Sequence, residues 1–224
     1  MTSQPPTVGA VVFDLDGTLV DSAEDIARCA NYALQHHGFA PLPHATLQGY
    51  IGDGARKLIA RACGRPEHSD TVAQLLPTFL AYYEEHAAAH TQLMPGAAKA
   101  LAALVDLPLA LCTNKPRTVT DRLLAALDLT SAFRVVVAGG DLPVHKPDPA
   151  LLTAVAGQLG VPPASLVMVG DGPQDVASGK AVGCRTVGVR GGILDEALLI
   201  ASEPDALLDG LDELEPLIRR WQHT

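Results

Sequence analysis

Residues 11–21 read Val-Val-Phe-Asp-Leu-Asp-Gly-Thr-Leu-Val-Asp, and this stretch decides how the rest of the chain is interpreted. Its apolar start, Val11 to Phe13, is β-branched or aromatic and predicts the end of a buried strand. Two carboxylates, Asp14 and Asp16, follow directly, although burying an uncompensated carboxylate is costly. Residues two apart in an extended chain point to the same side, so the pair can address one ligand. The alternative is an ordinary turn, in which Asp, Gly and Thr are common.

The composition indicates an acidic globular protein. Of the 224 residues, 48% are hydrophobic. The chain has 16 Lys and Arg and 25 Asp and Glu, which gives a net charge of −9. Because no basic run is present, the sequence predicts no nucleic-acid partner. No apolar run reaches the roughly 18 residues of a membrane span, and the first residues do not resemble a signal peptide, so no membrane partner is expected. The four scattered cysteines favour a reducing compartment, and the expected location is cytoplasmic.

A long helical segment separates the first strand from the next one. The next clear strand, residues 107–112, begins about 90 residues after Phe13. Helical spacing of apolar residues predicts three helices. The first begins with a capping-box-like Ser22 and Asp25, the second covers 55–62, and the third lies between 71 and 89. We therefore expect residues 21–93 to form a helical cap, and residues 1–20 and 94–224 to form an α/β core.

From residue 95 onward, short apolar runs alternate regularly with helical patterns. Such runs are typical of parallel strands that are buried on both faces of a sheet. The fold class expected is α/β, with a Rossmann-like parallel sheet core and an inserted small α-helical cap. The predicted strands cover 107–112, 135–138, 166–169 and 185–189, and the predicted helices cover 96–104, 117–127, 149–159, 174–182 and 211–221.

Polar residues follow four successive predicted strands. Ligands of open parallel sheets bind beyond the carboxyl ends of the strands, so these side chains should gather at one edge. Each has a plain alternative, as a helix cap or a surface lysine, but four incidental cases in one sheet are far less expected. The residues are Asp14 and Asp16, then Thr113 and Asn114, then Lys146, and finally Asp171 and Asp175.

This set of side chains suits chemistry at a phosphoryl group. Asp14, Asp16 and Asp171 offer the oxygen ligands that Mg²⁺ prefers and shares with phosphate. Thr113 and Lys146 would neutralise the phosphate oxygens. Neither a GxxxxGK[ST] loop nor a GxGxxG turn after a strand is present, so a P-loop or dinucleotide site is not supported.

Four ordered segments resemble the motifs of the haloacid dehalogenase-like hydrolase superfamily. The segments are Asp-Leu-Asp-Gly-Thr-Leu-Val-Asp at 14–21, Thr-Asn-Lys-Pro at 113–116, Lys-Pro-Asp-Pro at 146–149 and Gly-Asp-Gly-Pro-Gln-Asp at 170–175. The resemblance implies that Asp14 attacks phosphorus and that Asp16 protonates the leaving oxygen and then activates water. It also implies that Asp14, the Asp16 carbonyl and Asp171 hold Mg²⁺, with Asp175 in support. A second carboxylate at Asp16 favours phosphate chemistry over dehalogenation.

Within the superfamily, the chain is most similar to phosphoglycolate phosphatases. The similar features are the Thr-Asn-Lys-Pro segment, the Gly-Gly-Asp loop at 139–141 and the cap segment 50–62. The resemblance implies 2-phosphoglycolate as substrate, contacted by Gly17, Thr113, Asn114 and Lys146. In the cap, Arg56, Lys57 or Arg61 could meet a substrate carboxylate, or the three could be solvated helix charges. The chain departs from the family at Gly-Pro 172–173 and Gly-Gly 191–192, and neither departure is expected to touch a catalytic residue.

Other interpretations use the same residues. A sugar-phosphate phosphatase or a β-phosphoglucomutase-like enzyme would keep the core and change the cap contacts. A phospho-accepting receiver module also gathers Asp, Thr and Lys around Mg²⁺, but it is about half as long and has no helical insertion. His86 and His90, spaced i and i+4 on a predicted helix, have no third zinc ligand, so an exposed helix is favoured. The expected partner is a small phosphomonoester, and the expected assembly is a monomer or homodimer.

Overall fold

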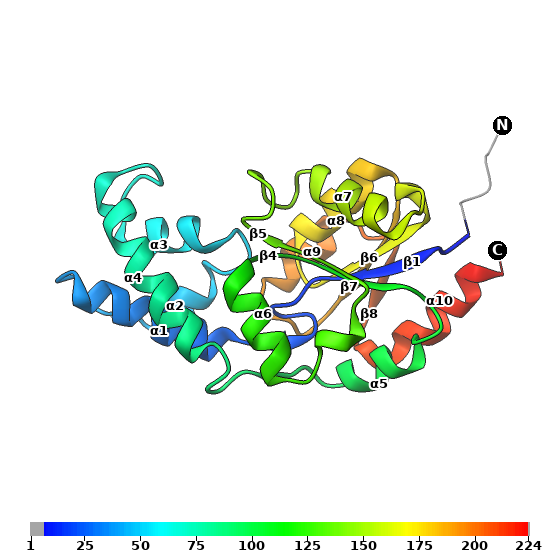
Figure 1. The fold of residues 1–224 in the computed structure, drawn as a ribbon, viewed down its shortest axis with the longest axis horizontal. Coiled ribbons are helices and arrows are strands. Elements are labelled where there is room, and N and C mark those ends of the chain that lie inside the picture. The colour runs from blue at the N-terminus through cyan, green and yellow to red at the C-terminus, as the bar shows by residue number, and fades with distance from the viewer. Residues whose placement is uncertain (1–6, 224) are drawn as a thin grey trace.

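A six-stranded parallel sheet forms the centre of the larger part of the molecule (Figure 1). The computed structural model describes residues 7–223. All neighbouring strands pair in parallel, and β1 lies between β4 and β6, where the chain order changes direction. Such a switch point is where ligands bind in open α/β sheets. In sheet order the strands are β5 (Val135–Gly139), β4 (Leu109–Pro116), β1 (Ala10–Phe13), β6 (Leu166–Gly170), β7 (Arg185–Val189) and β8 (Ala206–Leu208).

Helices cover both faces of the sheet, because alternate strand residues point to opposite sides. Val11 and Phe13 pack into a cluster with residues of α5 and α10, whereas Ala10 and Val12 pack with residues of α7. The expected α/β fold is therefore confirmed. The helices of this part are α5 (Ala97–Ala103), α6 (Arg117–Ala126), α7 (Ala150–Leu159), α8 (Pro173–Val182), α9 (Glu196–Ala201) and α10 (Leu214–Gln222), with 3-10 turns at Thr130–Ala132, Pro163–Ser165 and Leu211–Glu213.

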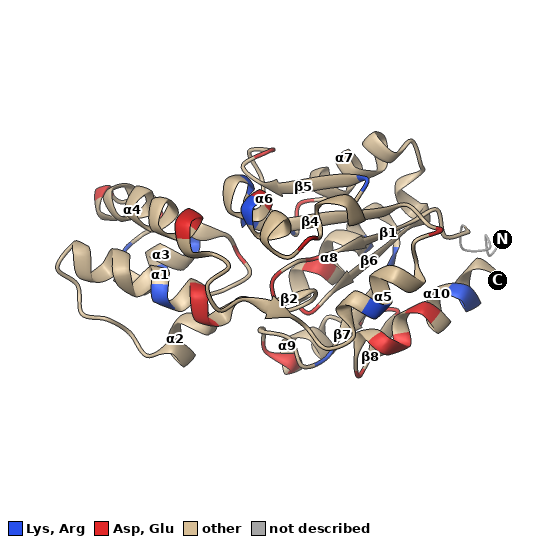
Figure 2. Ribbon diagram, turned by 60° about the horizontal axis from the view of Figure 1, so that its bottom comes forward, with Lys and Arg blue, Asp and Glu red and all other residues tan. Residues whose placement is uncertain are grey.

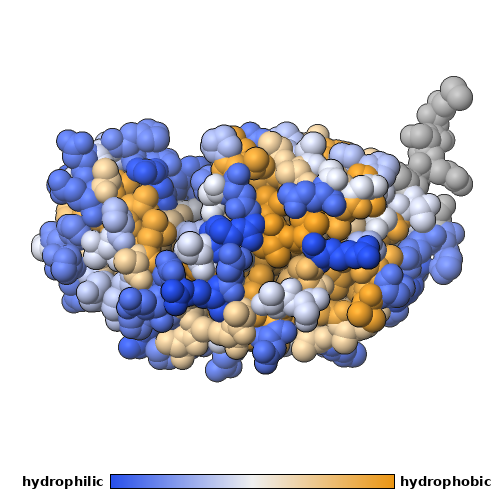
Figure 3. Space-filling model, in the orientation of Figure 1, coloured by the Kyte–Doolittle hydropathy of each residue, from blue (hydrophilic) through white to orange (hydrophobic). Residues whose placement is uncertain are grey.

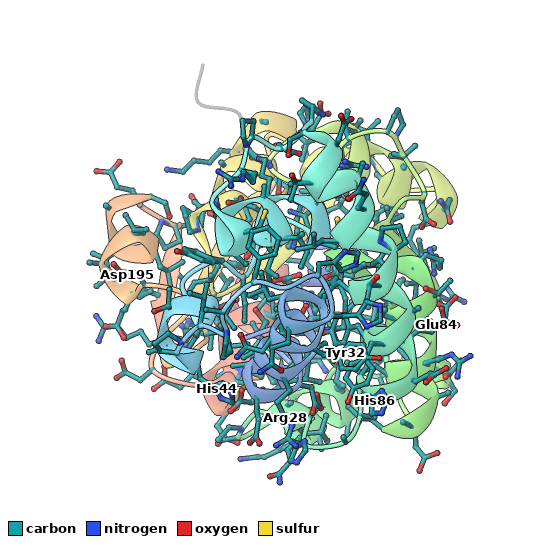
Figure 4. The ribbon with its side chains drawn as sticks, turned by 90° about the vertical axis from the view of Figure 1, so that its left-hand side faces the viewer. Arg28, Tyr32, His44, Glu84, His86 and Asp195 are labelled. Atoms are coloured by element: carbon teal, nitrogen blue, oxygen red, sulfur yellow. The ribbon has the colours of Figure 1, made fainter. Side chains whose placement is uncertain are left out.

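Four helices form a separate part at the carboxyl end of the sheet, on the left of Figure 1. They are α1 (Ala23–His36), α2 (His44–Gln48), α3 (Ala55–Cys63) and α4 (Asp70–His86), and they share a hydrophobic cluster of their own. On its outer surface Tyr82 stacks between Tyr32 and His86, with ring centroids 3.7 and 3.9 Å away, and Figure 4 labels the two outer rings. The short antiparallel pair β2 (Val20–Asp21) and β3 (Gln92–Leu93) joins this helical part to the sheet.

Several elements differ from the sequence expectations. The short elements α2, β2, β3, α9 and β8 were not predicted, and β4 continues to Pro116 instead of ending at residue 112. The predicted capping box is wrong, because the Ser22 hydroxyl donates to Asp16 and the Asp25 carboxylate accepts from His90 and Thr91. The expectation that His86 and His90 lie on one exposed helix is also wrong, because α4 ends at His86.

Charged residues are spread over both parts of the molecule. Figure 2 shows Lys and Arg scattered rather than gathered on one face, and Figure 3 shows more hydrophobic surface over the core than over the helical part. The absence of a nucleic-acid partner stays a prediction. Within residues 7–223, none of the helices has both the length and the apolar character needed to cross a membrane.

Candidate active site

Lys146 lies between two carboxylates at the carboxyl end of the central strand. Its Nζ is 2.7 Å from Asp14 Oδ1 and 2.6 Å from Asp175 Oδ1, and all three side chains are buried. Burial opposes the charge on Lys146, but the carboxylates of Asp14 and Asp175 outweigh it and raise the pKa of the ammonium group. The chain thus places a permanent positive charge directly beside Asp14.

A third buried carboxylate, Asp171, completes a compact acidic cluster. Carboxylate oxygens of Asp14, Asp171 and Asp175 lie within 4.8 Å of one another. Burial, with the charges of Asp14 and Asp175, raises the pKa of Asp171 to about 7. Like charges at this distance are unfavourable without a counter-ion, and oxygen donors are the ligands that Mg²⁺ prefers. The residues present therefore fit a hard divalent cation.

Two glycines leave room for the Asp171 carboxylate. A Cβ on Gly17, whose φ is +85°, would lie 2.1 Å from Asp171 Oδ2, and a Cβ on Gly192 would lie 2.3 Å from it. Asp171 also accepts hydrogen bonds from Thr18 Oγ1 at 3.1 Å and from the Ile193 backbone N–H at 2.9 Å. Gly192, one of the departures from the family pattern, thus packs against a predicted metal ligand, and the expectation that this departure affects no catalytic role stays a prediction.

Asp16 faces a different set of partners. Its Oδ1 accepts a hydrogen bond from Ser22 Oγ at 2.5 Å and an ion-paired hydrogen bond from Lys115 Nζ at 2.7 Å. Lys115 also donates to the phenol oxygen of Tyr83, which belongs to α4. Burial, together with the nearby charge of Asp16, raises the pKa of Tyr83, so the phenol stays protonated. The Asp16 side chain is therefore not part of the acidic cluster, and metal binding by its carbonyl stays a prediction.

Asn114 connects the loop of Lys146 to the helical part. Its amide oxygen accepts from the Lys146 backbone N–H at 2.8 Å, and its Nδ2 donates to the carbonyls of Lys146 and Gly52, at 3.1 and 2.9 Å. The neighbouring Thr113 is buried, and its hydroxyl accepts from the Lys115 backbone N–H at 3.2 Å. Asn114 therefore fixes the position of Lys146, while its substrate contact stays a prediction.

A pocket opens over Asp14 and Asp16, between the sheet and the helical part. Polar groups of the core line its floor and apolar side chains of α1, α3 and α4 line its roof, which suits a ligand with a charged end. The lining residues are Asp14, Asp16, Thr113, Asn114, Lys115, Pro116, Ile26, Ile51, Gly52, Gly54, Ala55, Leu58, Phe79 and Tyr83.

Arg56 and Arg61 do not line this pocket. Both are exposed on α3, where Arg56 donates to the Glu67 carbonyl at 3.5 Å and Arg61 pairs with Asp53 at 2.5 Å. The structure thus does not bring them to Asp14, and their contact with a substrate stays a prediction.

Two polar residues of the pocket, Lys115 and Tyr83, were given no role from the sequence. Lys115 lies inside the quoted Thr-Asn-Lys-Pro segment, and its place beside a strand end was the available signal. Tyr83 lies four residues after Phe79 on α4, and both are buried, so the sequence shows an ordinary core stripe. Its approach to Lys115 depends on how the helical part packs on the core.

The fold and the site together define an α/β protein with an acidic, lysine-bearing centre at its sheet switch point. The model of the family described as haloacid dehalogenase-like hydrolase matches residues 11–189, which is most of the chain. The chain therefore belongs to the haloacid dehalogenase-like hydrolase family, as the motifs predicted.

Individual relatives agree with this assignment. The chain is 38% identical to a phosphoglycolate phosphatase of Neisseria meningitidis, covering 92% of each chain, and 41% identical to one of Rhodospirillum rubrum, covering 80% of this chain and 78% of the relative. A crystal structure of a predicted phosphoglycolate phosphatase from Haemophilus somnus superposes with a TM-score of 0.86 at 29% identity, covering 94% of this chain and 97% of that one. These matches support the predicted enzyme class, a hydrolase of phosphoric monoesters.

Proposed function

We propose that this protein is a Mg²⁺-dependent phosphatase that hydrolyses 2-phosphoglycolate, a small phosphomonoester, through an aspartyl-phosphate intermediate. The observation that carries the proposal is the position of Asp14 beside Lys146, next to Asp171, at the floor of the pocket. The names of the relatives support the choice of substrate. The cytoplasmic location and the monomeric or homodimeric state stay predictions.

Asp14 and Asp171, with the Asp16 carbonyl, would hold Mg²⁺. Asp175 supports the site from behind, because its carboxylate is already engaged by Lys146 Nζ and by the Gly172 backbone N–H. A bound Mg²⁺ would neutralise charge on the acidic cluster and on the phosphate oxygens. The fit rests on the carboxylate oxygens of Asp14 and Asp171, which lie within 4.8 Å of each other in the buried acidic cluster.

In the first half of the reaction, an Asp14 oxygen attacks phosphorus and the bond from phosphorus to the ester oxygen breaks. Asp16 gives its proton to that leaving oxygen, so the alcohol departs neutral and Asp14 carries the phosphoryl group. Lys146 stabilises charge beside Asp14 because its Nζ is 2.7 Å from the Asp14 oxygen. The buried hydroxyl of Thr113 would donate to a phosphate oxygen.

In the second half, Asp16 removes a proton from water. The water oxygen attacks phosphorus, the bond from phosphorus to the Asp14 oxygen breaks, and inorganic phosphate leaves. Asp14 is again a free carboxylate and Asp16 again carries a proton, so the cycle closes without any other reactant.

Residues 21–93 would act as the cap over this reaction. The roof of the pocket comes from the helical part, and Asn114 and Lys115 contact it through Gly52 and Tyr83. A closed cap excludes water and holds the small organic part of the substrate near Asp14. Substrate contacts by Gly17, Arg56 and Arg61 stay predictions.

Phosphate release with Mg²⁺ tests the proposal directly. The panel contains 2-phosphoglycolate, hexose and pentose phosphates, nucleotides and pyrophosphate, and the wild type is compared with Asp14→Asn. We expect 2-phosphoglycolate to dominate and the variant to lose about 10³-fold or more in kcat, as for other lost nucleophiles. Asp121→Asn, which changes an exposed carboxylate on α6, is the matched control and should stay active.

The outcomes separate mechanism from substrate. If a sugar phosphate dominates and Asp14→Asn is inactive, the mechanism stands and a sugar-phosphate phosphatase or β-phosphoglucomutase-like activity replaces the proposed one. Activity that persists without the Asp14 carboxylate rules the mechanism out.

A further inference from the structure

Lys115 contributes the single positive charge among the described residues that line the pocket. Its side chain is 1% exposed, and its Nζ contacts Asp16 Oδ1 at 2.7 Å and the Tyr83 hydroxyl. Nζ also lies 4.6 Å from the centroid of the Tyr83 ring, which is within the range of a cation–π interaction. A buried cation in a ligand pocket is costly unless its charge is used there.

The two lysines of the site differ in how their charges are balanced. Lys146 is flanked by two buried carboxylates and faces the proposed phosphoryl position. Lys115 is paired with one carboxylate, that of Asp16, and its second partner is a neutral phenol. An ammonium group has three N–H donors, and within residues 7–223 these two partners take two of them. Lys115 therefore has a donor and a share of charge available to a ligand.

We propose that Lys115 is the specificity-determining residue that binds the carboxylate of the substrate, and that Tyr83 of the cap is the positioning residue that holds its ammonium group. This inference rests on the proposed function, because it assigns the end of the substrate that the phosphate site does not bind. Lys115, rather than the exposed Arg56 or Arg61, then supplies the positive charge that binds the substrate carboxylate.

Charge explains why this position selects a carboxylate. The floor of the pocket already carries the Asp14 carboxylate, so a further anion beside the ester would be repelled unless a cation met it. Phe79, Leu58 and Ile26 exclude water from the roof, so solvent cannot supply the compensation. A substrate with a neutral hydroxyl in the same place gains less from Lys115, since charge-assisted hydrogen bonds are about twice as strong as neutral ones.

Tyr83 would make this recognition depend on the docked cap. Lys115 comes from β4 of the core, whereas Tyr83 comes from α4 of the helical part, and the two meet above Asp16. The phenol oxygen and ring fix the ammonium group when the cap is closed. In an open form the same lysine would lose this constraint.

The test compares two substrates that differ at one end. They are 2-phosphoglycolate and 2-hydroxyethyl phosphate, in which a hydroxymethyl group replaces the carboxylate. The readout is the ratio of their kcat/KM values. We expect Lys115→Met to lower this ratio at least about 10-fold, mainly through KM for 2-phosphoglycolate, because a charged hydrogen bond is lost. A purely structural or acid–base defect would lower both values together and leave the ratio unchanged.

Further variants keep the test decisive. Lys115→Arg keeps the charge and should hold the ratio within about 3-fold of the wild type, whereas Tyr83→Phe should lower it by about 3-fold, the effect of one weak hydrogen bond. These two variants decide the question if Lys115→Met does not fold. Lys99→Met removes an exposed lysine paired with Asp212 and should leave activity and ratio unchanged.

Three results would overturn the inference. One is an unchanged ratio in Lys115→Met, and another is a collapse of the ratio in Arg61→Met instead. The third is a wild type that hydrolyses both substrates equally well, which leaves the phosphatase proposal intact. Failure of the proposed function itself is distinct, because then the wild type releases phosphate from neither substrate.

Discussion

Gly17 has a conformation and a neighbour that no other residue type accommodates. Its φ is +85°, and a Cβ would lie 2.1 Å from the Asp171 carboxylate. Gly38 is a matched control, because its φ is +80° but nothing lies within 4 Å of its would-be Cβ. We expect Gly38→Ala to lower the free energy of unfolding by about 1–2 kcal/mol, the cost of the left-handed conformation. Gly17→Ala should cost more and should also lower kcat/KM about 10²-fold by displacing Asp171.

Urea unfolding and phosphate release on the two variants measure these effects. Equal losses of stability, with activity kept in both variants, would contradict the close packing of Gly17 against Asp171.

Asp171 should make the effect of Mg²⁺ depend on pH. In the metal-free protein, burial and the charges of Asp14 and Asp175 raise the pKa of Asp171 from 3.8 to about 7. Between these two values the folded state binds more protons than the unfolded chain, so this group lowers stability as pH rises. Mg²⁺ requires the ionised carboxylate, so its stabilising effect should grow over the same range and level off above about pH 8.

Thermal unfolding at pH 5 to 8.5, with and without Mg²⁺, measures this linkage. The quantity to follow is the shift in Tm caused by the metal, which cancels the titration of groups outside the site. Asp171→Asn should lose most of the shift. A shift of the same size at every pH would show that Mg²⁺ does not compete with a proton at this carboxyl group.

At the residue scale, the part of the site that was predictable is the part that local sequence encodes. Asp14 and Lys146 follow buried strands, and parallel strands bring their carboxyl ends together in any such sheet. Tyr83 carries no such signal, because its contact with Lys115 depends on the packing of two separate parts of the molecule. The support of Asp171 by Gly192 likewise depends on a loop that follows β7 and returns to the site.

At the element scale, Asp25 fastens the start of α1 to the segment that follows α4. Its buried carboxylate accepts hydrogen bonds from the backbone N–H groups of His90 and Thr91, at 2.9 and 2.8 Å, and from the Thr91 hydroxyl at 2.8 Å. Burial acts to raise the pKa of Asp25, but these hydrogen bonds outweigh it and leave the pKa below 3.8. The stabilisation that the Asp25 carboxylate contributes is therefore fully present above the ordinary pKa of 3.8, and it is lost as pH falls through the lower pKa of the folded state.

Asp25→Asn should lower the free energy of unfolding by about 2 kcal/mol at pH 7, because an amide replaces a charged acceptor. The difference from the wild type should shrink below about pH 4, as the wild-type carboxyl group becomes protonated. Asp121→Asn, at an exposed pair with Arg117, should cost less than about 1 kcal/mol. Urea unfolding of the three proteins from pH 3 to 7 gives the comparison, and a difference that does not vary with pH would be evidence against this role of the charge.

The elements that could be predicted from the sequence are those long enough to show a run or a period of apolar residues. The strand β6 begins with four apolar residues in a row, and β7 places Val187 and Val189 in a β-branched stretch; both lie within one residue of the expected bounds. By contrast, β8 has three residues, too few to show a period, and forms because the edge of β7 offers unpaired backbone groups. The pair β2 and β3 has two residues each and depends on the crossing of two chain segments at the base of the helical part.

At the scale of the whole molecule, the two parts have separate hydrophobic clusters. Among residues 7–223, the cluster of α1 to α4 takes in just two buried residues from the core side, Val119 and Ile193. Polar contacts across the junction include Gln48 to the Ile193 carbonyl at 3.3 Å and the exposed pair of Arg122 with Glu84 at 3.0 Å. Exposed pairs of this kind stabilise little, so the helical part should open at a lower free energy than the sheet.

The four cysteines can report this difference, because each part holds two of them. Cys29 and Cys63 are buried in the helical part, and Cys112 and Cys184 are buried in the core. Burial raises the pKa of Cys29, Cys112 and Cys184 to about 12, so native thiols should react slowly and labelling should require opening.

Pulse labelling with a thiol reagent in increasing urea, read by mass spectrometry of peptides, should modify Cys29 and Cys63 at lower urea than Cys112 and Cys184. Because a ligand held between the two parts stabilises their docked form, Mg²⁺ with inorganic phosphate should reduce the difference in urea concentration at which the two pairs of cysteines become labelled. In Asp14→Asn, which weakens the proposed metal site, this difference in urea concentration should stay large in the presence of both ions. A single midpoint for all four thiols would mean that the sheet and the helices unfold as one cooperative unit. The helical part would then not open separately from the sheet, and a substrate could not act by stabilising its closed form.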